Sequence, residues 1–193
     1  MVQSDKNGHL IYSNGDILND RYRILGMIGE GTYSKVIKVQ DLHKNDEIIA
    51  MKIMKHYDSY RSAAKSEINI LEKLAKYDSH NEFNFIQMKD WFDYHGHICI
   101  ALEMLGPNIH EFMINNNYKP YSIEEVKQIT YQVIRMTNFM HTIKVRKNLI
   151  QISVKNVLYS LYWTYFKNQL LIVFSLVKKE KISNFWTEFS LYT

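Results

Sequence analysis

The sequence predicts an α+β fold, and three observations lead to this class. Runs of β-branched and apolar residues bounded by glycine or polar turns predict strands at 21–29, 35–41 and 47–55. Apolar residues then recur at helical spacing over 59–77, and do so again over 122–141. Two more strands are expected within 85–105. The order of elements is therefore β-β-β-α-β-β followed by helices, which is typical of an α+β domain.

The turn between the first two strands contains Gly29 and Gly31. A Cβ at either position would obstruct a bound phosphate or the positive φ that such a turn can require. Ser34 stands where a G-x-G-x-x-G series would have its third glycine. A hairpin turn without a ligand explains two glycines equally well. A dinucleotide-binding motif is disfavoured, because a strand and not a helix follows the turn.

The third strand, 47–55, carries Lys52 between apolar residues. Strand alternation places Lys52 on one face with Ala50 and Met54, while Ile49, Met51 and Ile53 line the other. An ammonium in such a strand needs a counter-charge or must reach water. Both outcomes remain open at this point.

The helix at 59–77 offers a counter-charge in Glu67. Glu67 lies at the edge of the apolar stripe and has no cation three or four residues away, so a long-range ion pair with Lys52 is expected. The remaining charge of Lys52 would then face an anionic ligand. The residues expected on the buried stripe are Ala64, Ile68, Leu71 and Ala75.

The last two strands are expected to turn at 94–97 around Gly96. The helix at 122–141 begins with Ser122 and Glu125 at the spacing of a capping box. One stripe of this helix is apolar and contains Val126, Ile129, Val133, Met136 and Met140.

Composition excludes several classes of function. The single cysteine, Cys99, excludes an internal disulfide framework and a cysteine-based zinc site, and the chain opens without a charged and apolar leader, so an intracellular location is expected. Residues 1–145 hold 17 Lys and Arg against 18 Asp and Glu, whereas 146–193 hold 7 against 2. The basic excess is confined to the end of the chain, which disfavours direct nucleic-acid binding.

The two ends of the chain are expected to lie outside the domain. Residues 1–19 read as a polar, flexible lead-in. All seven glycines and both prolines precede residue 146, and the composition of 146–193 is typical of a translated intron. The apolar stretch 157–177 is long enough to span a bilayer, but Lys167, Asn168 and Gln169 at its centre make insertion unfavourable.

Residues 20–145 resemble a eukaryotic protein kinase. The motifs are "GEGTYSKV" for the glycine-rich loop, "IAMK" for the strand lysine and Glu67 for the helix glutamate. The stretches "YRSAAKSEINILEKL" and "WFDYHGHICIALEMLG" are similar to the LAMMER family of dual-specificity, cdc2-like kinases. The resemblance implies an N-lobe of a five-stranded antiparallel sheet and one helix, with its hinge, over 20–105. The first C-lobe helices would follow over 106–145.

The resemblance also implies a site, a cofactor and partners. ATP would be the nucleotide, with magnesium in the complete family domain, and the family's substrates are serine- and arginine-rich splicing factors in the nucleus. Leu102 would be the gatekeeper, and Glu103 and Leu105 would offer hinge hydrogen bonds from the backbone. The remaining residues implied for ATP are Ile28, Gly29, Gly31, Val36, Ala50, Lys52 and Glu67.

The sequence departs from the family after His141. No aspartate follows Asp93, so the aspartates of a catalytic loop and of a D-F-G motif are not found, and the chain is expected to be truncated before them. Lys155 and Asn156 in "SVKNVLY" are interpreted as a chance echo of the catalytic loop. No catalytic and no metal-binding residue is assigned. The alternative to an ATP-binding kinase portion is a non-catalytic nucleotide-binding or scaffold module.

Overall fold

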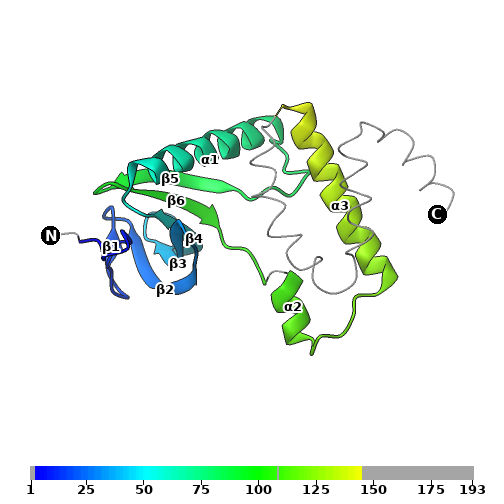
Figure 1. Ribbon diagram of the computed structural model, residues 1–193, viewed down its shortest axis with the longest axis horizontal. Helices are drawn as coiled ribbons and strands as arrows, with labels where there is room; N and C mark the ends of the chain where they lie inside the picture. Colours follow the sequence, from blue (N-terminus) through cyan, green and yellow to red (C-terminus); the bar gives the residue numbers. More distant parts are fainter. Residues whose placement is uncertain (1–2, 108, 145–193) are drawn as a thin grey trace. The chain divides into compact units, whose positions relative to one another are not determined.

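The computed structural model describes residues 3–107 and 109–144. These fall into two compact units, one made of residues up to 106 together with 130–144, the other of the described residues between 107 and 129. The first unit contains a sheet and the helix α1, Asp58–Tyr77 (Figure 1). The second contains α2, Ile109–Asn115, and the first part of α3, Ile123–Thr142.

The sheet has six antiparallel strands in the order β1-β2-β3-β4-β6-β5. The α+β class is confirmed, and the expectation of five strands is corrected by a two-residue edge strand that is too short to leave a periodic pattern. The strands are β1 Ile17–Leu18, β2 Tyr22–Glu30, β3 Ser34–Asp41, β4 Glu47–Met54, β5 Met88–Tyr94 and β6 His97–Glu103.

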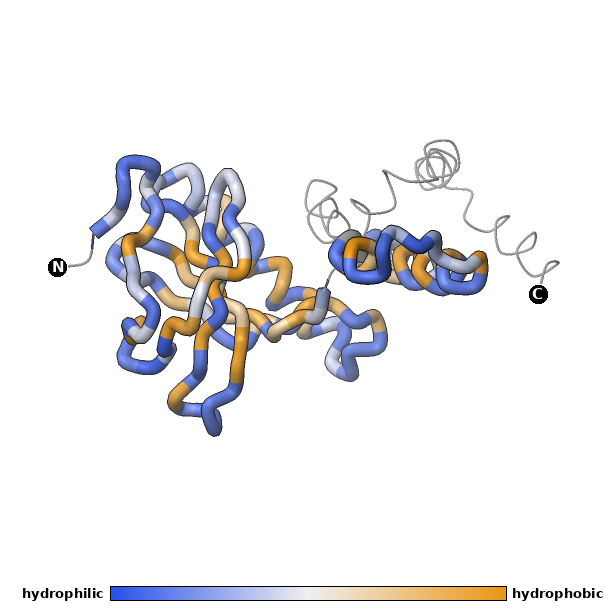
Figure 2. Tube along the Cα trace, turned by 90° about the horizontal axis from the view of Figure 1, so that it is seen from below, coloured by the Kyte–Doolittle hydropathy of each residue, from blue (hydrophilic) through white to orange (hydrophobic). Residues whose placement is uncertain are grey.

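Hydrophobic residues run along the strands, while the connecting loops are mostly hydrophilic (Figure 2). Alternation along β4 divides the core in two, as the sequence predicts. Ile49, Met51 and Ile53 belong to a cluster with residues of β2, β3 and β6. Ala50 and Met54 point to the opposite face, where they join a second cluster beneath α1.

Helix α1 packs on the sheet through a stripe close to the predicted one. Ala64, Ile68 and Leu71 are buried, but the fourth buried position is Leu74 and Ala75 is exposed. The expectation of Ala75 was wrong because 3.6 residues per turn carry the stripe to i+3 after Leu71.

Helix α3 begins with the predicted capping box. The backbone N–H of Ser122 donates to Glu125 Oε2 at 2.7 Å, and the N–H of Glu125 lies 3.3 Å from Ser122 Oγ. This exchange satisfies two of the N–H groups that a helix start leaves unpaired. Near the other end of α3, the Phe139 ring stacks on Phe83 with centroids 4.1 Å apart.

The hairpin between β5 and β6 turns where the sequence predicts. His95 and Gly96 both have positive φ, 51° and 91°, the conformation of a tight type I′ turn. A Cβ on Gly96 would lie 2.4 Å from His56 Nε2, so only glycine fits this position.

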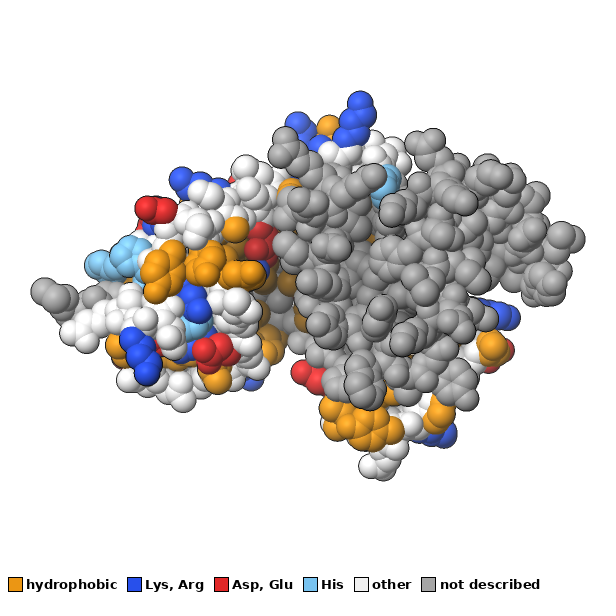
Figure 3. Space-filling model, in the orientation of Figure 1, with side chains coloured by type: hydrophobic (Ala, Val, Ile, Leu, Met, Phe, Trp, Pro, Cys, Tyr) orange, Lys and Arg blue, Asp and Glu red, His pale blue; other side chains and the backbone are white. Residues whose placement is uncertain are grey.

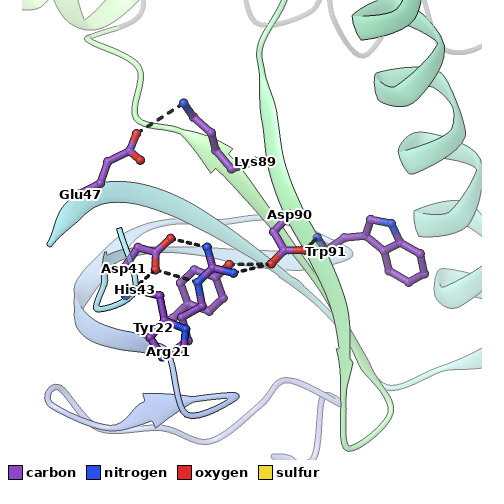
Figure 4. A network of polar contacts seen from close by, with 8 residues as sticks. All are labelled: Arg21, Tyr22, Asp41, His43, Glu47, Lys89, Asp90 and Trp91. Atoms are coloured by element: carbon purple, nitrogen blue, oxygen red, sulfur yellow. Dashed lines mark hydrogen bonds and ion pairs between the residues drawn. The ribbon is translucent and has the colours of Figure 1, made fainter. Parts of the chain in front are cut away.

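The sheet curls so that the start of β2 meets β5, although three strands, β3, β4 and β6, lie between them in the sheet. The Tyr22 and Phe92 rings stack with centroids 5.5 Å apart. Arg21 donates two hydrogen bonds of 2.7 Å to the buried carboxylate of Asp41 and a third, of 2.9 Å, to Asp90 (Figure 4). The Tyr22 hydroxyl donates to the same Asp90 oxygen at 2.9 Å. Arg21 is therefore the centre of a polar clamp that closes the curl.

The beginning of the chain packs against the sheet, which corrects the expectation of a flexible lead-in for its described part, from residue 3. Leu10 and Leu18 are buried in the first cluster. Ser4 Oγ lies 2.9 Å from Nε2 of His97, whose Nδ1 lies 2.8 Å from the carbonyl oxygen of Met54. Since a carbonyl only accepts, Nδ1 carries the proton and Nε2 accepts from the Ser4 hydroxyl. The polar composition of this segment hides these contacts.

We expect His97 to make the fold less stable below about pH 6.5. Its pKa is lowered from the ordinary 6.5 mainly by burial and also by His56, while the Met54 carbonyl, Asp93 and Asp5 act in the opposite direction. The unfolded chain therefore binds a proton more readily than the folded chain, so this contribution is complete above pH 6.5 and declines as the pH falls below it. Urea denaturation midpoints at pH 7.5 and 5.5 measure the effect.

The control for this measurement is His95, which is exposed on the same hairpin. His95→Asn should leave the difference between the two pH values unchanged. His97→Asn keeps an amide donor near the position of Nδ1 and should reduce the difference. An unchanged difference in His97→Asn would assign the acid sensitivity to other groups.

Candidate nucleotide-binding site

Lys52 and Glu67 form the centre of the candidate site. Lys52 Nζ donates to both carboxylate oxygens of Glu67, each at 2.7 Å. Both side chains are about one-fifth exposed, at 20% and 18%. The predicted ion pair between the third strand and the helix is confirmed. The pair joins β4 to α1 across fifteen positions of sequence. It gives the Lys52 ammonium hydrogen-bond acceptors that the apolar residues beside it on the strand do not provide.

The strand register places Lys52 directly across from the glycine turn. Gly29 pairs with Val36, Val36 pairs with Lys52, and Lys52 pairs with Ile100, so these residues form one row across the sheet. Cross-strand partners share a face, so Val36 and Lys52 lie on the same side. Strands are about 4.8 Å apart, which puts Lys52 roughly 10 Å from the backbone of Gly29. This distance suits a side chain that reaches toward the turn.

The other residues implied for a nucleotide base differ in their burial. Val36, Ala50 and Leu102 meet in the second cluster, on the face that carries Lys52. Ile28 and Leu105 are 48% and 57% exposed. Exposed hydrophobic side chains are visible on this unit in orange in Figure 3.

Glu103 lies at the end of β6, with part of its hydrogen-bonding capacity already used. Its backbone N–H donates to Gln87 O at 2.9 Å, and its carboxylate accepts from the N–H of Gln87 at 2.8 Å. A backbone hydrogen bond from Glu103 to a ligand would therefore involve its carbonyl group. Leu105 follows in the segment after the strand, where no regular element continues.

The glycine turn differs in one respect from the sequence-based expectation. Neither Gly29 nor Gly31 has a positive φ, so the turn does not require glycine for its conformation. A Cβ on Gly29 would meet no atom within 4 Å, and one on Gly31 would lie 3.7 Å from Ser34 O. The described residues would therefore accept a Cβ at both positions, and the open space above them is compatible with a ligand that approaches the backbone closely.

The tip of the glycine turn is held by residues that the sequence does not predict. The N–H of Lys55 donates to the carbonyl of Tyr33 at 3.0 Å. The Tyr33 ring meets Tyr60 of α1 edge to face, with centroids 5.1 Å apart. The tip is thus tied to the end of β4 and to the helix. The sequence shows only that an aromatic residue, Tyr33, follows two glycines, and this pattern does not predict which residues Tyr33 contacts.

Among residues 3–107 and 109–144, no group of three or more His, Cys, Asp or Glu side chains is placed to hold a metal ion. No helix in these ranges combines the length and the apolar character that crossing a bilayer requires.

A curled antiparallel sheet with one helix, whose glutamate pairs with a strand lysine behind a glycine turn, is the N-terminal lobe of a protein kinase. The family model described as "Protein kinase domain" matches residues 22–160. The chain therefore belongs to the protein kinase family. A crystal structure of a kinase domain matches this chain with a TM-score of 0.63 and 28% sequence identity. The match covers 72% of this chain and 40% of the chain in that crystal structure.

Within this family the similarity is to the LAMMER kinases. The chain is 48% identical over 141 residues to the serine/threonine-protein kinase Doa of Drosophila melanogaster. It is 43% identical over 140 residues to the dual specificity protein kinase CLK2 of Homo sapiens. It is also 43% identical over 139 residues to the probable dual specificity protein kinase madd-3 of Caenorhabditis elegans. The resemblance drawn from the motifs is confirmed.

The matches cover 72–73% of this chain but only 17%, 28% and 16% of these three relatives. The family match also runs fifteen residues past the boundary at 145 that the sequence predicts. It includes Lys155 and Asn156, which the sequence analysis assigned to chance. These two residues and the apolar stretch 157–177 lie outside the described residues.

Proposed function

We propose that the lobe binds ATP as the nucleotide-binding portion of a LAMMER-type protein kinase. The observation that carries this proposal is the Lys52–Glu67 pair on the face that holds Val36, Ala50 and Leu102. An ammonium has three N–H donors, and Glu67 accepts two of them. The third is available to a phosphate oxygen, and Glu67 fixes the direction in which it points.

The order of residues along this face supports a nucleotide in one orientation. The apolar residues Ala50 and Leu102 can cover a flat base, and the glycine turn lies at the other end of the row that contains Lys52. Backbone N–H groups and a lysine suit phosphates. The adenine would therefore lie toward β6 and the phosphates toward the glycine turn.

The substrates and the location are part of the same proposal. We infer that the protein substrates are rich in serine and arginine and that the protein acts in the nucleus, because the LAMMER resemblance implies both. The chain as given is proposed to bind the nucleotide without transferring phosphate, since no aspartate follows Asp93. A non-catalytic nucleotide-binding module is the second candidate, and the same observation favours it.

We expect Lys52→Met to weaken ATP binding to the purified chain by about 10- to 150-fold. A hydrogen bond to a charged group contributes about 1.5–3 kcal/mol, and each 1.4 kcal/mol is a factor of ten in affinity. Isothermal titration with ATP and magnesium gives the dissociation constant.

The matched control for this titration is Lys44→Met, which removes an exposed lysine from the turn between β3 and β4. It should bind as the wild type does. Equal affinity in Lys52→Met, or no binding by a wild-type chain that is folded by circular dichroism, would refute the proposal.

A further inference from the structure

Residues 3–12, here called the N-terminal strap, form a small closed loop. Ser4 and Leu10 make an isolated antiparallel bridge. The Asp5 carboxylate accepts from the backbone N–H of Asn7 at 2.8 Å and of His9 at 2.9 Å. These hydrogen bonds give the strap a defined conformation of its own, so that it can transmit a constraint to the elements it contacts.

The strap contacts both strands that meet at the glycine turn. Nε2 of His9, a residue only 3% exposed, lies 3.3 Å from Glu30 Oε1. Asp5 Oδ2 lies 3.9 Å from Lys35 Nζ. Glu30 and Lys35 are register partners, the last pair of β2 and β3 before the turn. The strap therefore contacts the last residue pair before the glycine turn on both strands, with His9 beside Glu30 and Asp5 near Lys35.

The strap also contacts the segment that leads into α1. The N–H of His56 donates to Gly8 O at 2.9 Å. Gly8 has a φ of 79° and packs on the ring of Tyr57, where a Cβ would lie 2.4 Å from a ring carbon. The Tyr57 ring meets Tyr60 edge to face with centroids 5.6 Å apart. Only glycine allows this close approach.

These contacts form a closed circuit. The strap reaches Tyr60 through Tyr57, Tyr60 contacts Tyr33 at the tip of the glycine turn, and the strap also holds Glu30 at its base. A turn held at base and tip samples fewer conformations than a free hairpin. The same circuit includes the start of the helix that carries Glu67.

We propose that the N-terminal strap positions the glycine turn, with His9 and Gly8 as positioning residues. The strap sets the turn above Lys52 and orders it before a ligand arrives, so that release of the strap lowers the fraction of molecules in the binding-competent form. The effect on ATP rests on the proposed function. The effect on the turn itself does not.

The test compares two glycine substitutions in the full chain. Gly8→Ala places a methyl group against Tyr57, and Gly15→Ala, at a φ of 94°, imposes a similar backbone strain with no atom within 4 Å. Hydrogen exchange of the amides of residues 29–35 is measured without nucleotide. Gly8→Ala is expected to speed this exchange by about tenfold more than Gly15→Ala, because the fraction of molecules in which the turn is open would rise about tenfold.

Two further variants keep the test decisive if Gly8→Ala does not fold. Gly8→Ala with Tyr57→Ala removes the ring that the methyl group meets, and slow exchange of the turn should return. His9→Leu fills the buried position with an apolar side chain and removes the imidazole beside Glu30. It should speed exchange at 29–35 without affecting β6.

Titration with ATP and magnesium completes the experiment. A nucleotide would bind only molecules whose turn is ordered, so each variant should raise the dissociation constant by the reciprocal of the fraction of molecules in which the turn stays ordered. If the wild-type chain binds no ATP, the proposed function fails, and the exchange data still decide whether the strap positions the turn. Equal exchange at 29–35 in Gly8→Ala, His9→Leu and Gly15→Ala would overturn the inference.

Discussion

The purified chain is expected to transfer no measurable phosphate from radiolabelled ATP to a serine- and arginine-rich peptide. Phosphoryl transfer depends on carboxylates that orient the substrate hydroxyl and hold magnesium. The last aspartate of the sequence, Asp93, lies near the end of β5 and accepts hydrogen bonds from Arg61 and from the N–H of Gly96, both at 2.7 Å. Its pKa is lowered, first by the hydrogen bond from Arg61, so it remains an ion-pair partner.

The expected loss of phosphate transfer is large. Loss of one group that stabilises a transition state costs about 10²–10³ in rate, so the loss of two should leave no detectable activity. A Lys52→Met chain provides the background for the assay. Transfer by the wild type that disappears in Lys52→Met would show that another acid in the chain performs the catalysis.

Replacing Arg21 by methionine is expected to destabilise the lobe by about 3–5 kcal/mol. The Asp41 side chain is 2% exposed and accepts two hydrogen bonds from Arg21. Without Arg21, the buried carboxylate of Asp41 would lose its main charge partner. The same change releases Asp90 on β5. The hydrogen bonds from Arg21 are also the first cause of the lowered pKa of Asp41.

The control for this prediction is Arg23→Met. Arg23 lies two residues further along the chain, and its side chain makes an exposed hydrogen bond of 3.2 Å to Gln40. Exposed contacts of this kind contribute little, so the free energy of unfolding should change by less than about 0.5 kcal/mol. Urea denaturation at pH 7 measures both variants. Equal shifts of the two midpoints would mean that the clamp around Arg21 does not stabilise the curl.

The sequence predicts those features that local patterns encode. Alternation along β4 separates the two faces correctly, and the missing local partner of Glu67 leads to the ion pair with Lys52. The turn at Gly96 and the capping box of α3 are likewise read from four-residue signals. In each case the interacting residues are close in sequence, or one of them lacks any nearby alternative.

The missed features depend on contacts between distant residues that have ordinary local environments. Ser4 meets His97 across 93 positions, and Arg21 meets Asp90 across 69. Nothing in the neighbourhood of these residues indicates a partner. Of the two reasons considered for the glycines at the turn, a positive φ is wrong, because the sequence shows that two glycines are present but does not give their φ values.

The curl of the sheet has a consequence for synthesis on the ribosome. Strand β4 pairs with β3 on one side and with β6 on the other, and β6 begins 43 residues after β4 ends. Until His97–Glu103 emerges, one edge of β4, a strand with apolar residues on both faces, stays unpaired. Arg21 likewise has no contact with Asp90 until β5 has been made. Such an edge favours pairing with other chains. The nascent lobe is therefore most prone to pairing with other chains between the emergence of β4 and that of β6.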